Sequence, residues 1–134
     1  MKIYLAGPMR GYEEFNHPAF RKAAKLLRAT GHTVFCPAEH DGEAGLNVTG
    51  MTGDLGEIAE AGVSLRDLLG ADLAWITGTA DALVMMPGWE DSAGARAEAA
   101  VALTLSLPVW DLARFLLYDA SAPQICCVPA GGAA

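Results

Sequence analysis

The sequence predicts an α/β protein: a single domain built on an open, parallel, Rossmann- or flavodoxin-like sheet of four or five strands, with helices on both faces. Three observations predict this fold. Short apolar, β-rich stretches alternate along the chain with longer stretches of helical periodicity. Glycine or proline ends several of the apolar stretches, as expected where strands leave a sheet. Hydrophobic residues make up 52% of the 134 residues and charged ones 19%, which is enough for one buried core.

The first part of the chain predicts a strand, a helix and a second strand. Residues 2–7 (KIYLAG) are apolar and end at Gly7 and Pro8. Over residues 18–29 apolar side chains recur at helical spacing, and Gly31 supplies a stop. Residues 32–38 (HTVFCPA) follow as a strand broken by Pro37. This order implies a right-handed crossover between two parallel strands.

Residues 39–62 carry six glycines among polar residues and show little periodicity apart from a short turn near Ile58. This is long for a connection without secondary structure in a compact domain. Two interpretations stand at equal weight: a mobile surface excursion, or a lid over a site.

The second part of the chain predicts further alternation. Ser64 is the expected N-cap of a helix over residues 64–77, and residues 81–86 (DALVMM) form an apolar strand stopped by Pro87. An alanine-rich helix over residues 94–106, a strand over 107–112 and a short helix over 113–120 follow. We expect residues 1–120 to form the domain and residues 121–134 a loosely ordered tail.

Charge and composition limit the partners. The formal net charge of −7 opposes binding of nucleic acid polymers, but it allows a single small anion to bind. The first residues lack a signal peptide, and no apolar run approaches the roughly 20 residues of a membrane span. Cys36, Cys126 and Cys127 show no metal-ligand spacing and indicate a reducing compartment. We therefore expect a cytoplasmic protein that needs neither metal nor cofactor and contacts no membrane.

Two glycine-bearing stretches fall where ligands gather in such a sheet, at the carboxyl ends of strands. GPMRG follows the first strand, and PGWEDSAGARAEAA follows DALVMM and leads into a helix. Free backbone N–H groups at a glycine turn or a helix start can hold an anion. Ser92 and Gly94 lie at that helix start. The two stretches together predict a pocket for a phosphorylated ligand.

Three side chains are candidates for the chemistry. Glu98 lies among alanines, Asp72 lies in a mainly apolar helix and Tyr4 lies inside the first strand. Each also has a structural interpretation: a partner of the helix dipole for Glu98, a solvated helix face for Asp72 and simple packing for Tyr4. Asp67 and Asp81 are alternative carboxylates.

Convergence of the three at one cleft would suit cleavage of a base–sugar bond. Glu98 would act on the sugar carbon as nucleophile or charge stabiliser, and Asp72 would protonate the leaving base. The Tyr4 phenol would orient Glu98 and hold it ionised.

The span from Lys2 to about Leu112 resembles the nucleoside 2-deoxyribosyltransferase superfamily, through the motifs IYLAGPMRG, DLAWI, DALVMMPG and SAGARAE. It is most similar to the branch of 2-deoxynucleoside 5′-monophosphate N-glycosidases and related phage-type, DUF4406-like proteins. The resemblance implies that Glu98 is the catalytic glutamate, Asp72 the acid or base-contacting aspartate and Tyr4 the residue that orients Glu98. It places the 5′-phosphate among Gly7, Met9, Arg10, Gly11, Ser92 and Gly94.

The resemblance also implies a homo-oligomer, a dimer or larger, in which a neighbouring subunit completes the site. The apolar residues of RFLLY, residues 114–118, would either support that association or cover the sheet. Trp89 is a candidate for stacking on the base, or else a core or dimer contact.

The expected function is therefore that of an N-glycosidase or deoxyribosyltransferase acting on nucleoside 5′-monophosphates. Two alternatives stay open. PGWEDSAGARAE loosely resembles the PGGxGTxxE signature of phosphoribohydrolases that act on ribonucleotides, with different spacing and with Trp89 at the second glycine. A nucleotide-binding module without turnover would use the same fold and phosphate site.

Overall fold

The computed structural model describes residues 1–121 of the chain, and residues 122–134, with Cys126, Cys127 and nearly all of the predicted tail, lie outside the described part. The elements follow one another as β1 (Lys2–Ala6), η1 (Glu13–Asn16), α1 (His17–Ala29), β2 (Thr33–Phe35), α2 (Pro37–Glu43), α3 (Leu55–Glu60), α4 (Leu65–Gly78), β3 (Ala82–Met85), η2 (Trp89–Asp91), α5 (Ala93–Thr104), β4 (Val109–Asp111) and α6 (Leu112–Ser121). This alternation confirms the predicted α/β class.

Four parallel strands form the sheet, in the order β2-β1-β3-β4. The chain passes from β1 to the neighbouring β2 and then crosses to β3 on the other side of β1, so the strand order reverses between β1 and β3. Open α/β sheets bind ligands at the carboxyl ends of the strands where this reversal occurs. Ala6 and Met85, paired at the ends of β1 and β3, mark that place.

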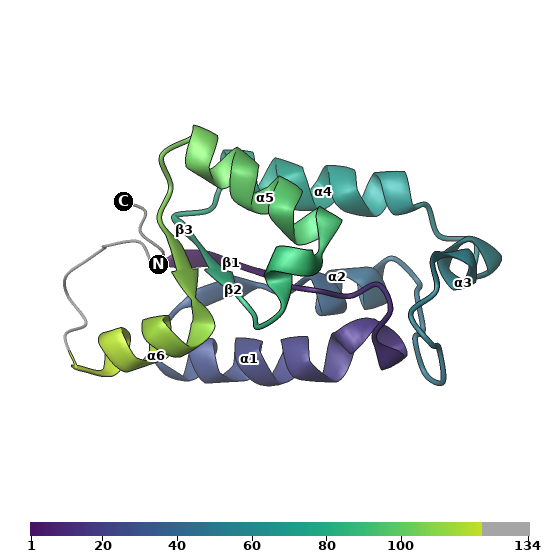
Figure 1. Cartoon of the computed structure of the whole chain (residues 1–134), viewed down its shortest axis with the longest axis horizontal. Coiled ribbons are helices and arrows are strands. Elements are labelled where there is room, and N and C mark those ends of the chain that lie inside the picture. The colour runs from purple at the N-terminus through teal and green to yellow at the C-terminus, as the bar shows by residue number, and fades with distance from the viewer. Residues whose placement is uncertain (122–134) are drawn as a thin grey trace.

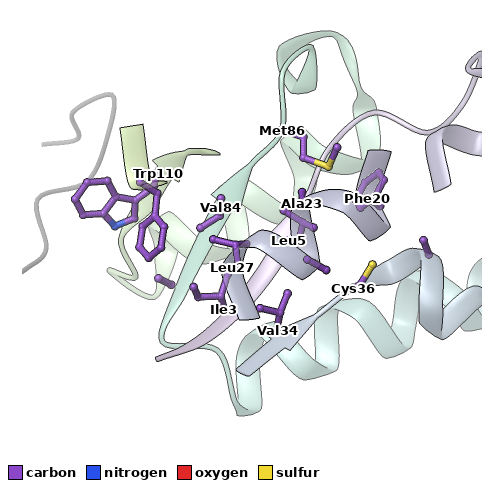
Figure 2. Close-up of a cluster of buried hydrophobic side chains, with 14 residues drawn as sticks. Ile3, Leu5, Phe20, Ala23, Leu27, Val34, Cys36, Val84, Met86 and Trp110 are labelled. Atoms are coloured by element: carbon purple, nitrogen blue, oxygen red, sulfur yellow. The ribbon is translucent and has the colours of Figure 1, made fainter. Parts of the chain in front are cut away.

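Helices cover both faces of the sheet. Figure 1 shows α4 and α5 on one side and α1 and α6 on the other. Successive residues of β1 point to opposite faces of the sheet. Because Ile3 to Ala6 are all buried and mainly apolar, both faces of this strand are apolar. Ile3 and Leu5 pack toward α1 with Phe20 and Leu27, as Figure 2 shows, and Tyr4 packs toward α4 and α5.

The last described helix covers the sheet through part of the RFLLY stretch. Phe115 is buried in the α1 side of the core, its ring edge-on to Trp110, and Leu116 packs partly against the same cluster. For these two side chains the predicted covering role is therefore confirmed. Among the described helices, none combines the length and the hydrophobicity needed to cross a bilayer.

Two helices, α2 and α3, lie in or at the start of the glycine-rich segment 39–62, for which the sequence shows little periodicity. Pro37 does not end a strand but begins α2, because its fixed φ and missing N–H suit the first turn of a helix. The short turn expected near Ile58 is α3, whose start carries a reciprocal capping box between Asp54 and Glu57. Residues 37–43 and 55–60 are therefore helical, although the sequence showed little periodicity there.

The segment between α2 and α4 also has a small core of its own. Phe15, Leu46, Val48 and Ile58 are buried together, with Met9 partly buried against them. Phe15 reaches this core from η1, where Glu14, Phe15 and Asn16 all have positive φ values between 50° and 62°. Left-handed backbone at three successive non-glycine residues is costly, so burial of the Phe15 ring helps to hold it.

Candidate active site

A cavity of about 410 Å³ lies at the carboxyl ends of β1 and β3. Its volume is typical of small-molecule sites, which range over about 300–1,000 Å³. The apolar part of its wall comes from Phe15, Phe20, Pro37, Leu55, Ile58, Leu65, Leu68 and Leu69. The side chains that bring charge or a hydroxyl group are Arg10, Tyr12, Asp41, Asp72, Asp91, Ser92, Arg96 and Glu98.

Tyr4 and Glu98 form the best-defined polar contact at the cavity. The Tyr4 hydroxyl donates a hydrogen bond of 2.6 Å to Oε2 of Glu98. Tyr4 is fully buried in β1 and its ring stacks on Phe35, so the hydroxyl has a fixed position. Glu98 is 7% exposed and lies on the inward face of α5, where it lines the cavity. The Glu98 carboxylate therefore has a side-chain partner in Tyr4 and is more than a partner of the helix dipole.

The environment of Glu98 sets its proton affinity. Burial raises the pKa of the Glu98 carboxyl to about 8, and the hydrogen bond from Tyr4 opposes that rise. The negative charges of Asp72 and Asp41 raise the pKa further. Burial, more than any other cause, raises the pKa of the Tyr4 hydroxyl well above its ordinary value, so Tyr4 keeps its proton and remains a donor.

Asp72 lies on α4 at the same cavity and is 8% exposed, so the interpretation as a solvated helix-face residue is wrong. Burial raises the pKa of its carboxyl to about 7, with a further rise from the charge of Asp41 and a decrease from the Tyr4 hydroxyl. Oδ1 of Asp72 lies 3.8 Å from Nδ1 of His40, too far for a hydrogen bond, and neither atom has another partner within residues 1–121.

The alternative carboxylates lie elsewhere. Asp67 is exposed in the first turn of α4, where its backbone N–H donates to Oγ of Ser64. Oδ2 of Asp81 accepts a 2.8 Å hydrogen bond from the backbone N–H of Lys2, at the opposite end of the sheet from the cavity. Neither residue lines the cavity.

The start of α5 forms a part of the cavity suited to an anion. Ser92 is the N-cap residue, and its Oγ accepts a hydrogen bond from the backbone N–H of Ala95. Gly94 lines the cavity with no atom within 4 Å of a Cβ built on it. Arg10 and Arg96 line it as well, and within residues 1–121 neither guanidinium has a carboxylate partner. A helix N-terminus beside unpaired cations favours a phosphate or carboxylate group.

The glycine turn after β1 is organised differently from what the sequence predicted. Gly7 and Met9 line the cavity, but the backbone N–H of Gly11 donates to the carbonyl of Gly53 at 2.9 Å. The backbone N–H of Tyr12 donates to the carbonyl of Met9. These two N–H groups are therefore occupied within the chain, and Gly11 does not line the cavity. The residues of this turn that line the cavity are Gly7, Pro8, Met9 and Arg10.

Trp89 also lies outside the lining. Its side chain packs partly against the core between the sheet and α5, which is the structural alternative to base stacking. No three His, Cys, Asp or Glu side chains within residues 1–121 are grouped so that they could hold a metal ion.

Comparison with protein families gives a match over residues 1–111 to the domain of unknown function DUF4406. The chain belongs to the DUF4406 family. A solved structure of a 2-deoxyribosyltransferase from Bacillus psychrosaccharolyticus is similar to this DUF4406 protein with a TM-score of 0.50 and 27% sequence identity. The similarity covers 83% of this chain and 71% of that enzyme. Comparison with curated proteins gives no match.

These comparisons support the superfamily expected from the sequence motifs. They also agree with the observed Rossmann-like sheet of this DUF4406 protein, whose four parallel strands are flanked by helices. The motifs IYLAGPMRG and SAGARAE, on which the expectation depended, lie at the carboxyl end of β1 and at the start of α5.

The cavity of the DUF4406 protein contains residues that sequence reasoning missed. Asp41, on the unpredicted helix α2, is 6% exposed and lines the cavity beside Pro37. Arg96 lies one helical turn after Ser92, on the face that meets the cavity. Pro37, followed two residues later by Glu39, is a helix-start signal, and Asp41 lies one helical turn after Pro37. This signal marks the start of the helix but not the burial of Asp41.

Proposed function

We propose that this DUF4406 protein is an N-glycosidase or deoxyribosyltransferase that cleaves the base–sugar bond of deoxynucleoside 5′-monophosphates. The observation that carries the proposal is the buried hydrogen bond from Tyr4 to Glu98. Glu98 and Asp72 line the same cavity, and Tyr4, which is not part of the lining, holds the Glu98 carboxylate. The similarity to a 2-deoxyribosyltransferase supports the same chemistry.

The first chemical step uses two carboxyl groups. The ionised carboxylate of Glu98 attacks the anomeric carbon as the bond between that carbon and the base nitrogen breaks. The electron pair of the broken bond stays with the base, and the proton of Asp72 neutralises it. The pKa of Asp72 is raised to about 7 and that of Glu98 to about 8. When the pair holds one proton, the reactive form, with the proton on Asp72 and with Glu98 ionised, is therefore the less populated of the two forms. Tyr4 acts as a positioning residue, since its hydroxyl holds the carboxylate of Glu98.

The second step releases the sugar from Glu98. Water or a second base attacks the anomeric carbon, Glu98 departs as a carboxylate, and the proton of the attacking group returns to Asp72. Attack by water completes hydrolysis, and attack by a base completes transfer. Exclusion of water favours transfer, and the apolar lining from Leu55, Ile58 and Leu68 contributes to that exclusion.

The charge distribution of the cavity supports a phosphorylated substrate. Asp41, Asp72 and Glu98 influence one another's charge and form one acidic group, and Asp91 lines the cavity next to Ser92. The positive charges of the lining come from Arg10 and Arg96. A nucleoside monophosphate matches this pattern, with a sugar that becomes positively charged in the transition state and a phosphate that is negative. Both arginines are exposed, and neither forms an ion pair with a residue of the described part of the chain, so each can approach such a phosphate without losing one there.

A panel of deoxyribo- and ribonucleoside 5′-monophosphates tests the proposal, with the released base measured by chromatography. We expect base release by the wild type, loss of release in Glu98→Gln, and wild-type release in the control Glu60→Gln, an exposed carboxylate on α3. Release from ribonucleotides alone would indicate a phosphoribohydrolase. Binding of a monophosphate without release would indicate a nucleotide-binding module. Equal release by wild type and Glu98→Gln would contradict the proposed mechanism.

The proposal includes the organisation of the protein. Residues 1–120 act as one deoxyribosyltransferase-like domain, and the protein forms a dimer or larger homo-oligomer in the cytoplasm. Light scattering coupled to size-exclusion chromatography measures the assembly, and a monomer at all concentrations would contradict it.

A further inference from the structure

His17 and Asp41 form a buried polar pair that the proposed mechanism does not use. Nε2 of His17 lies 3.1 Å from Oδ2 of Asp41, and the two residues are 1% and 6% exposed. Buried ionisable pairs contribute little to stability, because loss of hydration offsets their attraction. Asp41 lines the cavity, but His17 does not. The position of the pair therefore indicates a role in the site, with His17 behind Asp41.

The backbone holds Asp41 in a defined position. Asp41 and Pro37 are one helical turn apart on α2 and share the face that lines the cavity. His17 is the first residue of α1, which packs against α2. Because Oδ2 of Asp41 contacts His17, the direction of the second oxygen is also set. No described residue donates a hydrogen bond to Oδ1 of Asp41, which leaves an acceptor free for a ligand.

Asp41 also lies close to the groups that carry the proposed chemistry. Its negative charge contributes to the raised pKa values of Asp72 and Glu98. The preceding residue on α2, His40, comes within 3.8 Å of Asp72. Helix α2 thus brings two successive side chains toward the acidic groups of the cavity.

We propose that Asp41, oriented by His17, accepts a hydrogen bond from the exocyclic amino group of the base and makes the site select amino bases over their oxo counterparts. This inference rests on the proposed function, which places the phosphate at Arg10 and Arg96 and the sugar at Glu98. The base would then occupy the remaining part of the cavity, whose lining includes Asp41 and the apolar side chains.

The selectivity follows from the hydrogen-bonding capacity of a carboxylate, which only accepts. The amino group of adenine or cytosine donates to it. Hypoxanthine and uracil carry a carbonyl at the same position. Its oxygen and the Asp41 carboxylate would both be acceptors, so neither would gain a hydrogen bond. Such a mismatch at a sheltered site discriminates by about tenfold or more.

Two pairs of nucleotides that differ mainly in this group test the inference: dAMP with dIMP, and dCMP with dUMP. The kcat/KM for base release is measured for wild type and Asp41→Asn, whose amide can donate to a carbonyl. The control is Glu43→Gln, an exposed residue of α2 outside the cavity lining. We expect the wild type and the control to prefer the amino member by about tenfold or more, and Asp41→Asn to lower that ratio at least fivefold.

A second variant and a binding measurement complete the test. Asp41→Ala, which leaves room for water, should abolish the preference without reversing it. Calorimetric titration of the same four nucleotides covers the case in which the wild type releases no base. Amino-selective binding that Asp41→Asn abolishes would then support this inference although the proposed enzyme had failed. The same amino-to-oxo ratio in wild type and Asp41→Asn would overturn the inference and leave the proposed function standing. Failure of all four nucleotides to bind would overturn both.

Discussion

The hydroxyl of Tyr4 and the carboxylate of Glu98 lie 2.6 Å apart, although 94 positions of sequence separate the two residues. They meet because β1 carries Tyr4 beneath α5, and the inward face of α5 carries Glu98 among alanines. A phenol that keeps its proton can only donate to the carboxylate, so the hydrogen bond favours the ionised form of Glu98. Burial opposes this and has the larger effect, which keeps the carboxyl in a range where it titrates near neutral pH.

The two acidic groups predict a narrow pH optimum. The pKa values of Asp72 and Glu98 are raised to about 7 and about 8, and both groups face one cavity. Below about pH 7 both carboxyls are protonated and no nucleophile exists; above about pH 8 both are ionised and no acid remains. Between these values the pair shares one proton, and only the fraction with that proton on Asp72 is reactive. We therefore expect a bell-shaped profile of kcat/KM with its maximum between these values, and its two apparent pKa values describe the pair rather than either residue. A flat profile from pH 5 to 9 would contradict this assignment.

Removal of the Tyr4 hydroxyl should move that optimum. The hydroxyl lowers the pKa of both Glu98 and Asp72, so Tyr4→Phe raises both values and shifts the bell to higher pH. At pH 7.5 we expect kcat/KM to fall by about 10- to 100-fold, with partial recovery in more alkaline buffer. Tyr12→Phe is the control, because Tyr12 lines the cavity without a hydrogen bond to Glu98. A loss of activity in Tyr4→Phe with an unchanged optimum would argue against the electrostatic role.

The elements with clear periodicity could be predicted from sequence, and α2 could not. Helices α1, α4 and α5 bury apolar residues at helical spacing, and β3 is continuously apolar. Helix α2 has only seven residues, PAEHDGE, and includes both a proline and a glycine. Its buried positions are Pro37, Ala38 and Asp41, which form no recognisable apolar face. Packing against α1 holds this helix in place. A contact between segments that are distant in the chain leaves no pattern in the local sequence of α2.

The same limit applies to the site. Glu98 and Asp72 were identifiable because each is a carboxylate among apolar neighbours in a periodic helix. Asp41 lies in a polar stretch, so the sequence does not show that this one carboxylate is buried. The interpretation of the glycine turn was incomplete for a related reason. The Gly11 N–H donates to the carbonyl of Gly53, which lies 42 positions later in the chain (53 − 11 = 42). No local pattern around Gly11 reveals this contact.

Glu98→Gln should stabilise the protein at alkaline pH while it abolishes turnover. The folded-state pKa of Glu98 is raised to about 8, so its favourable contribution is fully present below the ordinary value of 4.5 and is lost as pH rises through 8. Glutamine has no such dependence and can still accept from Tyr4. At pH 8.5 we expect a gain in unfolding free energy on the order of 2 kcal/mol, with little change at pH 5. Thermal unfolding of wild type, Glu98→Gln and Glu60→Gln across this range measures it; a lower Tm of Glu98→Gln at every pH would mean that the carboxylate is structural.

Arg96 should distinguish phosphorylated from unphosphorylated substrates. Its guanidinium lines the cavity one turn after the N-cap of α5, and no described carboxylate neutralises it. Arg96→Met keeps an unbranched side chain in place of the aliphatic stem of arginine and removes the charged guanidinium. We expect KM for a nucleoside monophosphate to rise about tenfold and KM for the corresponding nucleoside to stay unchanged. Arg114→Met, exposed on α6 away from the cavity, is the matched control. An equal rise in both KM values would mean that Arg96 supports the fold of the site rather than the phosphate.

The contact between Gly53 and the turn after β1 should fix the position of the segment that contributes Leu55 and Ile58 to the cavity wall. Gly53 has a φ of +95°, and a Cβ built on it would lie 2.7 Å from the backbone N of Tyr12 and 2.8 Å from that of Gly11. Its carbonyl also accepts the hydrogen bond from Gly11. Because the obstructing atoms are backbone, Gly53→Ala must displace the segment that carries Leu55 and Ile58, two residues of the cavity wall.

Gly50→Ala separates this contact from simple backbone strain. Gly50 lies in the same segment with a φ of +78°, and nothing lies within 4 Å of a Cβ built on it. Gly50→Ala should therefore cost about 1 kcal/mol, the strain of a left-handed alanine alone. Gly53→Ala should cost clearly more, raise KM at least severalfold, and expose residues 44–63 to limited proteolysis, because loss of the contact frees this segment from the turn. The same melting temperature and the same KM in the two variants would show that the turn and the segment move independently, and that Gly53 has no part in shaping the cavity.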